Sequence, residues 1–141
     1  MNRSNTGRCF LDANVWLYAF IESQDRKKSR IAKQVIQNKE TFVSGQVINE
    51  VSINLIRKAR FDEARIRRLI ISFYRNYHVV ESGRELLLKA CALRSNYGFS
   101  FWDGMIVASS LAAGATTLYT EDMHDGLVVD DRLTILNPFH S

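Results

Sequence analysis

Proline and cysteine are almost absent from this chain of 141 residues, which contains one proline, two cysteines and seven glycines. So few proline and glycine residues leave no room for a flexible linker between separate modules. The two cysteines, Cys9 and Cys91, are too few for a disulfide framework, and their spacing matches no metal-binding motif. The length suits one domain, which we expect to span residues 1–141.

Long hydrophobic runs are also absent, because no apolar stretch reaches the roughly 18 residues that a helix needs to cross a bilayer. The best candidate, residues 9–21, is interrupted by Asp12 and Asn14. The polar segment before it, residues 1–8, is not typical of a secretory signal. With 46% hydrophobic and 24% charged residues, the chain is predicted to be a globular, cytoplasmic protein with no membrane partner.

The net charge of +4 conceals an uneven distribution along the chain. Residues 1–94 carry 18 Lys and Arg against nine Asp and Glu, whereas residues 95–141 carry one arginine against six acids. An asymmetry of this kind suggests contact with a nucleic acid. Solvated helix faces explain many charge runs equally well, so the motifs have to decide between the two interpretations.

Short apolar runs alternate with segments of helical periodicity. Strands are predicted at 9–11, 41–43, 78–80, 116–119 and 133–136, and helices at 15–21, 27–38, 46–59, 82–95 and 101–113. A further helix is predicted after Asp62, and its apolar stripe consists of Ile66, Leu69, Ile70 and Phe73. Asp62 can cap its helix, and the sequence SGRE that starts at Ser82 has the form of a capping box. Ser100 and Asp103 have the same spacing, and Gly114 is the natural end of the apolar helix that follows them. This alternation predicts an α/β fold with a mostly parallel sheet.

Four carboxylates occupy similar places relative to these predicted elements. Asp12 closes the first strand, and Asp122 follows the fourth. Glu50 and Asp103 lie in the first turns of helices. In an open α/β sheet, ligands bind at the carboxyl ends of the strands, beside helix N-termini, so we expect the four acids to converge. Like charges in one crevice raise one another's pKa values, and a divalent cation removes that conflict. An all-oxygen set of carboxylates suits Mg²⁺ or Mn²⁺, with several waters retained.

Each acid also has a structural interpretation. The helix dipole favours Asp103 as a simple cap partner, and Asp12 can form a turn with Asn14. Asp122 can belong to an exposed acidic loop. Glu50 shares part of an apolar, core-facing stripe, where a carboxylate is costly unless it is paired or bound to a cation. Any one of these interpretations is adequate alone, but the four acids together favour a cation site.

Four short segments contain the acids discussed above: FLDANVWLYA at 10–19, VINEV at 47–51, FWDGMIVA at 101–108 and LYTEDMHDG at 118–126. In these four segments the sequence resembles the motifs of PIN-domain ribonucleases. The ending TILNPF at 134–139 is particularly similar to that of bacterial VapC-type toxins. The resemblance covers about residues 9–139. It implies a three-layer α/β/α domain that hydrolyses RNA with Mg²⁺ or Mn²⁺. It also implies the toxin of a type II toxin–antitoxin pair, a homodimer held by a cognate, VapB-like antitoxin.

The resemblance also assigns roles to individual residues. It carries the metal-binding and catalytic role to Asp12, Asp103, Glu50 and Asp122. Whether Asp122 or Asp125 supplies the last ligand stays open at this point, as does the number of ions. Asn14 and Thr120 match positions that usually support such a site through hydrogen bonds.

An acidic site repels phosphates until a metal fills it, so attraction for RNA has to come from other parts of the chain. Basic side chains cluster at 26–33 and at 57–68, and the second cluster can equally hold another protein. The candidate phosphate-binding residues are Arg57, Lys58, Arg65, Arg67 and Arg68. Aromatic side chains near the motifs can stack an unpaired base, with core packing as the alternative; they are Trp16, Tyr18, Phe101 and Trp102.

Other functional classes fit the sequence less well. A phosphatase of the haloacid dehalogenase type needs a second Asp two residues after Asp12, but that position holds Asn14. A receiver-like signalling domain needs adjacent acids after the first strand and a lysine near the last, and neither is present. Two alternatives remain, a PIN nuclease of RNA processing that is not a toxin and an RNA-binding module without catalysis.

Overall fold

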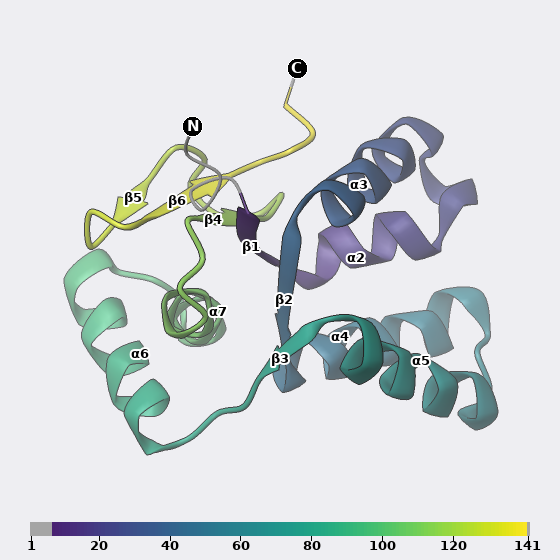
Figure 1. The fold of residues 1–141 in the computed structure, drawn as a ribbon, viewed down its shortest axis with the longest axis horizontal. Coiled ribbons are helices and arrows are strands. Elements are labelled where there is room, and N and C mark those ends of the chain that lie inside the picture. Colours follow the sequence, from purple (N-terminus) through teal and green to yellow (C-terminus); the bar gives the residue numbers. More distant parts are fainter. Residues whose placement is uncertain (1–6, 141) are drawn as a thin grey trace.

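The computed structural model describes residues 7–140 of the chain. Its strands are β1 (Arg8–Leu11), β2 (Glu40–Ser44), β3 (His78–Val80), β4 (Thr117–Tyr119), β5 (Val128–Val129) and β6 (Leu133–Leu136). Its helices are α2 (Ala13–Phe20), the short 3₁₀ helix η1 (Glu22–Gln24), α3 (Arg26–Asn38), α4 (Gly45–Ala59), α5 (Glu63–Asn76), α6 (Arg84–Tyr97) and α7 (Phe101–Ala112). Strands and helices alternate along most of the chain, as the sequence predicts (Figure 1).

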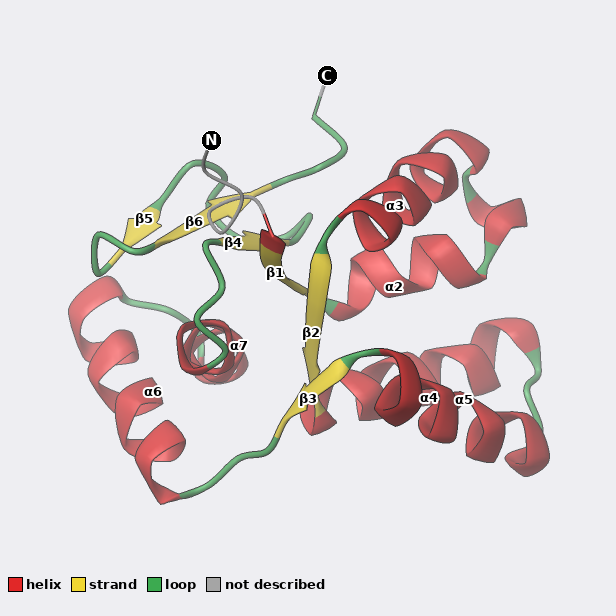
Figure 2. Ribbon diagram, in the orientation of Figure 1, coloured by secondary structure: helices red, strands yellow, loops and turns green. Residues whose placement is uncertain are grey.

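The six strands form one sheet in the order β3-β2-β1-β4-β6-β5. Every pairing is parallel except the one between β5 and β6. Helices α2 to α5 lie on one side of the strands, and α6 and α7 lie on the other (Figure 2). The expected α/β fold, with a mostly parallel sheet between two helical layers, is therefore confirmed. No helix in the described part of the chain is long and apolar enough to span a membrane.

Strand β1 lies at the centre of the sheet and of the core. Its Phe10 and Leu11 are completely buried, as expected for a strand that has parallel neighbours on both sides and helices on both faces. Trp16 of α2 is also completely buried, and its indole N–H donates to the carbonyl of Leu11 at 3.2 Å. Of the two interpretations of Trp16, core packing is the correct one, because its ring packs edge-on against Phe73 at 5.0 Å.

The starts of α2 and α6 differ from the sequence-based prediction by two residues, and those of α3 and α4 by one. Helix α2 begins at Ala13, two residues early, because the carboxylate of Asp12 accepts a hydrogen bond from the Ala13 N–H at 2.7 Å. The capping box at Ser82 is wrong. Helix α6 begins at Arg84, two residues later than predicted, with Gly83 as its N-cap, and no side chain caps it.

Both cysteines are free in the structure.

The prediction also missed strand β5, whose two residues are too few to produce a periodic pattern. Ser100 does cap α7, accepting from the N–H of Asp103 at 3.2 Å. Asp62 caps α5 in the same way, accepting from Arg65 at 2.9 Å. Helix α7 ends just before Gly114, whose φ of 70° is readily adopted only by glycine.

Candidate active site

The carboxyl ends of the parallel strands place the four acids at one edge of the sheet. Asp12 directly follows β1, and Asp122 follows β4 by three residues. Glu50 lies in α4, the helix that directly follows β2. Asp103 comes from the first turn of α7, on the opposite face of the sheet. A pocket of about 250 Å³ is lined by all four acids and by Asn14, Gln46, Asn54 and Trp102, among others. The structure thus brings together acids that lie up to 110 positions apart, between Asp12 and Asp122.

Asp12 is the buried acid of this group, with 8% of its surface exposed. Burial, with a smaller contribution from the nearby charges of Glu50 and Asp103, raises the pKa of Asp12 to about 6 against the lowering effect of two hydrogen bonds. Within residues 7–140, no lysine, arginine or histidine forms an ion pair with any of the four pocket acids. The pocket therefore concentrates negative charge without a protein cation to compensate for it.

Asn14 and Thr120 join the two acids that come from opposite ends of the chain. The Thr120 hydroxyl donates to Oδ2 of Asp12 at 2.9 Å and accepts from the N–H of Asp122 at 3.2 Å. The side-chain amide of Asn14 donates to Oδ2 of Asp122 at 3.0 Å, and its oxygen accepts from the N–H of Glu121 at 3.2 Å. These bonds fix the position of Asp122 relative to Asp12.

Asp103 does more than complete a helix cap. Its backbone N–H donates a hydrogen bond to the hydroxyl of Ser100, but its carboxylate makes no hydrogen bond or ion pair with any described residue. A reciprocal bond from that carboxylate to the start of the helix would have made the acid a structural cap partner. Instead, the Asp103 side chain lines the acidic pocket.

The position of Glu50 differs from the one predicted from the sequence. It does not share the core-facing stripe of α4, since Val47 and Val51 are completely buried whereas Glu50 is exposed. Successive residues of a helix are about 100° apart, so Glu50 lies beside the stripe and lines the pocket from its outer edge. The expected cost of a buried carboxylate therefore applies to Asp12 and not to Glu50.

Asp125 lies outside the pocket. It accepts from the N–H of Asn137 at 2.8 Å and contacts Nδ1 of His140 at 2.7 Å. The backbone bond from Asn137, together with His140, lowers the pKa of Asp125 below its usual value. Of the two acids that the sequence left open, the pocket contains Asp122.

The donors of this pocket fit a hard divalent cation. Among residues 7–140, the pocket lining offers carboxylate and amide oxygens but no imidazole or thiol. Within the same residues, no group of three or more acidic, histidine or cysteine side chains lies close enough together to hold a metal ion. Mg²⁺ does not need three such ligands, because it keeps several of its waters and binds through one or two carboxylates. The donor set therefore suits Mg²⁺ or Mn²⁺ held partly through water.

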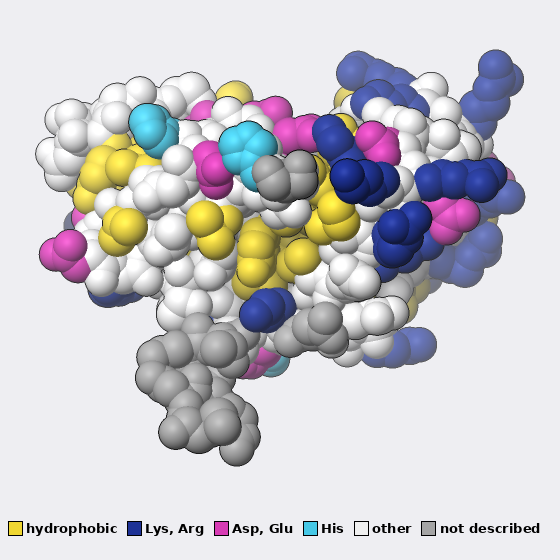
Figure 3. Space-filling model, turned by 90° about the horizontal axis from the view of Figure 1, so that it is seen from above, with side chains coloured by type: hydrophobic (Ala, Val, Ile, Leu, Met, Phe, Trp, Pro, Cys, Tyr) yellow, Lys and Arg dark blue, Asp and Glu magenta, His cyan; other side chains and the backbone are white. Residues whose placement is uncertain are grey.

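The predicted phosphate-binding residues are all exposed, on α4 and α5. Figure 3 shows that Lys and Arg side chains also gather on the side of the molecule where α3 lies. Lys28 of α3 is paired with Glu121, in the loop that carries Asp122. Tyr18 is half-buried and donates to Glu121 at 3.0 Å. Trp102 remains exposed and lines the acidic pocket.

The model of the PIN domain family matches residues 9–124, which include the positions of all four pocket acids. The chain belongs to the PIN-domain family. The mostly parallel sheet with its acidic edge is the PIN fold in this protein. A comparison with curated protein sequences finds no significant match.

Solved structures with the same PIN fold are distant in sequence. A toxin–antitoxin complex from Klebsiella pneumoniae is 17% identical, with a TM-score of 0.71 over 94% of this chain and 99% of that one. VapC20 of Mycobacterium tuberculosis, a toxin that cleaves the sarcin–ricin loop, is 21% identical, with a TM-score of 0.64 over 81% and 89%. VapBC2 of Rickettsia felis, bound to a promoter DNA fragment, is 15% identical, with a TM-score of 0.60 over 92% and 98%. At these identities, the likeness shows the fold alone.

Proposed function

We propose that this PIN-domain chain is an endoribonuclease that depends on Mg²⁺ or Mn²⁺. The observation that carries the proposal is the convergence of four carboxylates in one pocket, with no cationic partner among the described residues. A fold that gathered these acids for stability alone would have paired them, because uncompensated carboxylates at close range repel one another. Binding of a divalent cation explains why they are left unpaired.

Each pocket acid has a part that follows from its environment. Asp12 and Asp103 are proposed as the direct ligands, Asp12 because its position is fixed and Asp103 because its carboxylate is free. Glu50 and Asp122 lie at the rim and would hold water on the ion or a second ion. Asn14 and Thr120 orient Asp122 and Asp12. A divalent cation at this place supplies an acidified water and neutralises the negative charge that develops on the phosphate.

The products of the reaction distinguish two mechanisms. Attack by water leaves a 5′-phosphate and a 3′-hydroxyl, whereas attack by the ribose 2′-hydroxyl leaves a cyclic phosphate. We expect the first result. The test is to incubate the protein with total RNA, with and without Mg²⁺ or Mn²⁺, and to map the ends. Cleavage that continues in EDTA, or cyclic phosphate ends, would contradict the proposal.

We further propose that the chain is the toxin of a type II toxin–antitoxin pair and forms a homodimer bound to a VapB-like antitoxin in the cytoplasm. The support is the fold shared with the toxin–antitoxin complexes of K. pneumoniae and R. felis. Exposed isoleucines on α4 and α5 offer apolar surface to such partners; they are Ile53, Ile56, Ile70 and Ile71. Exposed Arg and Lys side chains on the same helices are proposed to attract RNA phosphates.

Co-expression with the neighbouring gene product tests the toxin assignment. The chain should co-purify with a small protein and gain nuclease activity when that protein is removed. Equal activity with and without every co-expressed neighbour would favour the alternative, a PIN nuclease of RNA processing. Binding of RNA without metal-dependent cleavage would favour the non-catalytic module.

A further inference from the structure

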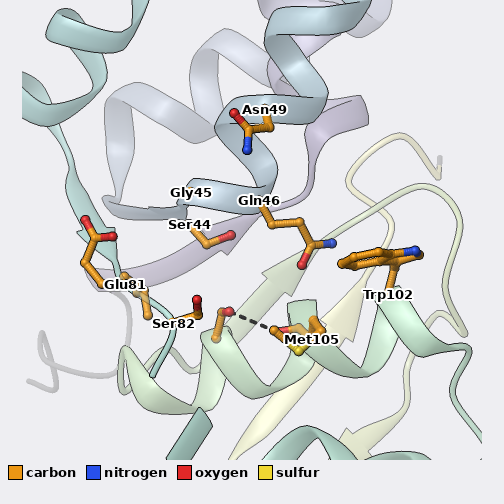
Figure 4. Close-up of a pocket in the computed structure, with 10 residues that line it drawn as sticks. Ser44, Gly45, Gln46, Asn49, Glu81, Ser82, Trp102 and Met105 are labelled. Atoms are coloured by element: carbon orange, nitrogen blue, oxygen red, sulfur yellow. Dashed lines mark hydrogen bonds between the residues drawn. The ribbon is translucent and has the colours of Figure 1, made fainter. Parts of the chain in front are cut away.

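Trp102 lies where three hollows of the surface meet. Its indole lines the acidic pocket, a neighbouring pocket of about 400 Å³ and a third one of about 330 Å³. Trp102 immediately precedes Asp103 in α7, and 61% of its surface is exposed. Figure 4 shows the indole opposite the side chain of Gln46, which extends toward it from α4. The acidic pocket thus continues past Trp102 into a groove between α4 and α7.

The exposure of Trp102 has no structural explanation in this fold. The other tryptophan, Trp16, is completely buried, as a large aromatic side chain in a small domain usually is. The neighbouring Phe101 is also exposed and packs edge-on against Trp102, with ring centroids 5.0 Å apart. The Arg94 guanidinium lies over the Phe101 ring at 4.3 Å, and Phe101 lines none of the three pockets, whereas Trp102 lines all of them. An aromatic face that is open beside a concave surface is typical of a binding site.

Gln46 and Asn49 form the opposite wall of this groove. They lie three residues apart on α4, and therefore on neighbouring turns of one face. Neither side-chain amide has a hydrogen-bond partner in the protein among the described residues. Each amide offers both donors and an acceptor to a ligand. An apolar protein segment laid over them would leave these groups unsatisfied, whereas a polar planar ligand would pair with them.

We propose that Trp102, Gln46 and Asn49 form a subsite for one unpaired base of the RNA substrate, next to the phosphate that is cut. The base stacks on the indole of Trp102, and its polar edge meets the two amides. This inference rests on the proposed function, since the acidic pocket beside the groove would position the neighbouring phosphate. Only a base that is free of its own stack and pairing partner can enter, so the subsite selects single-stranded or looped RNA over duplex.

Binding measurements in EDTA test the subsite without cleavage. The probes are labelled octaribonucleotides of each single base, together with an octamer of ribose phosphate that carries no bases. Trp102→Ala should weaken binding of the base-containing RNAs by about 5- to 150-fold, the range expected for one stacked base. Binding of the base-free octamer should not change. Trp102→Phe should retain most of the affinity. Leu88→Ala, which removes an exposed apolar side chain of α6 outside the three pockets, is the control.

The amides and the indole give separate readouts. Gln46→Ala and Asn49→Ala should change the ratios of affinity among the four homopolymers by up to about tenfold, with little effect on the base-free octamer. Because Trp16 is buried, acrylamide quenches mainly Trp102, and base-containing RNA should protect it. The base-free octamer should give no such protection.

Three results would overturn the subsite. They are an unchanged affinity of Trp102→Ala for the homopolymers, an equal loss for base-free and base-containing RNA, and protection of Trp102 by raised protein concentration without RNA. The last result would assign the groove to a second copy of the chain. A parallel cleavage assay with Mg²⁺ keeps the two proposals apart. Base-dependent binding without cleavage would contradict the proposed function alone, and cleavage without base-dependent binding would contradict the subsite alone.

Discussion

Aspartates of the acidic pocket and aspartates of the C-terminal loops have the same side chain, but their carboxylates have opposite electrostatic environments. In the loops, Asp130 is bonded by Lys89 at 2.7 Å and by Tyr97 at 3.0 Å, and Asp125 contacts His140. In the pocket, Asp12 and Asp103 have carboxylates for neighbours and no cation among the described residues. Asp125 and Asp130 are compensated within the protein, and the pocket acids are not.

The directions of the pKa shifts express this difference. The hydrogen bond from Lys89 lowers the pKa of Asp130, whereas burial and two like charges raise that of Asp12. Acids that stabilise a fold have lowered pKa values, because their charged form is the favoured one. The raised pKa of one acid in a cleft that other acids also line is instead characteristic of a functional site.

The largest expected effect separates the two regions by activity. Asp103→Asn keeps the side-chain shape and its capping ability but removes the charge that holds a cation. RNA cleavage should fall by at least about 100-fold, since a catalytic metal supplies several kcal/mol. Asp12→Asn should behave in the same way. Asp130→Asn should cleave at nearly the wild-type rate, and a gel-based cleavage assay with circular dichroism as the folding control measures all three.

A second comparison concerns the two acids that follow β4. Asp122→Asn should reduce cleavage by about 10- to 100-fold, the range for a group that acts through the ligand sphere. Asp125→Asn should change cleavage little, because its partners are Asn137 and His140 at the C-terminal end. Initial rates at saturating Mn²⁺ decide between them. A larger loss of cleavage in Asp125→Asn than in Asp122→Asn would show that Asp125, and not Asp122, is the fourth acid of the site.

Stability in metal-free buffer should also separate the regions. Because the folded protein binds the proton of Asp12 more tightly than the unfolded chain does, its stability falls as the pH rises from 3.8 to about 6. Above that window, Asp12→Asn should be more stable than the wild type by up to about 3 kcal/mol, and below it the two should converge. Urea unfolding in EDTA at pH 4 and pH 7 measures the difference. Equal stability of the two proteins at pH 7 would contradict the raised pKa.

The smallest effect is expected from the Lys89–Asp130 pair. Both side chains are partly exposed, so Lys89→Ala should cost less than about 1 kcal/mol in the free energy of unfolding. Because the pKa of Asp130 is lowered, this contribution is present at neutral pH and is lost as the pH falls toward the acid range. Urea unfolding and the cleavage assay together check the prediction, with cleavage expected to stay unchanged.

Much of the fold follows from local patterns. The strands at 9–11 and 133–136 lie within or match β1 and β6, because continuous apolar runs fit a sheet buried on both faces. The order of strands and helices then places residues after β1, β2 and β4 at one edge, which is why the convergence of the acids was predictable. The start of α6 was not predictable in this way, since Ser82 and Gly83 both suit an N-cap.

The environment of each site residue was harder to predict. Periodicity gave Glu50 a place near the core stripe, but its exposure depends on the angle at which α4 packs. The choice between Asp122 and Asp125 depends on long-range bonds from Asn14 and Asn137, which no local pattern encodes. Trp16 and Trp102 both lie beside motifs in the sequence, and only the tertiary structure buries one and exposes the other.

Binding of Mn²⁺ tests the central claim most directly, because it asks whether the uncompensated acids hold a cation before any RNA is present. Calorimetric titration should show saturable Mn²⁺ binding to the wild-type protein and to Asp130→Asn, and a loss of that binding in Asp103→Asn. Wild-type affinity for Mn²⁺ in a correctly folded Asp103→Asn protein would contradict the account.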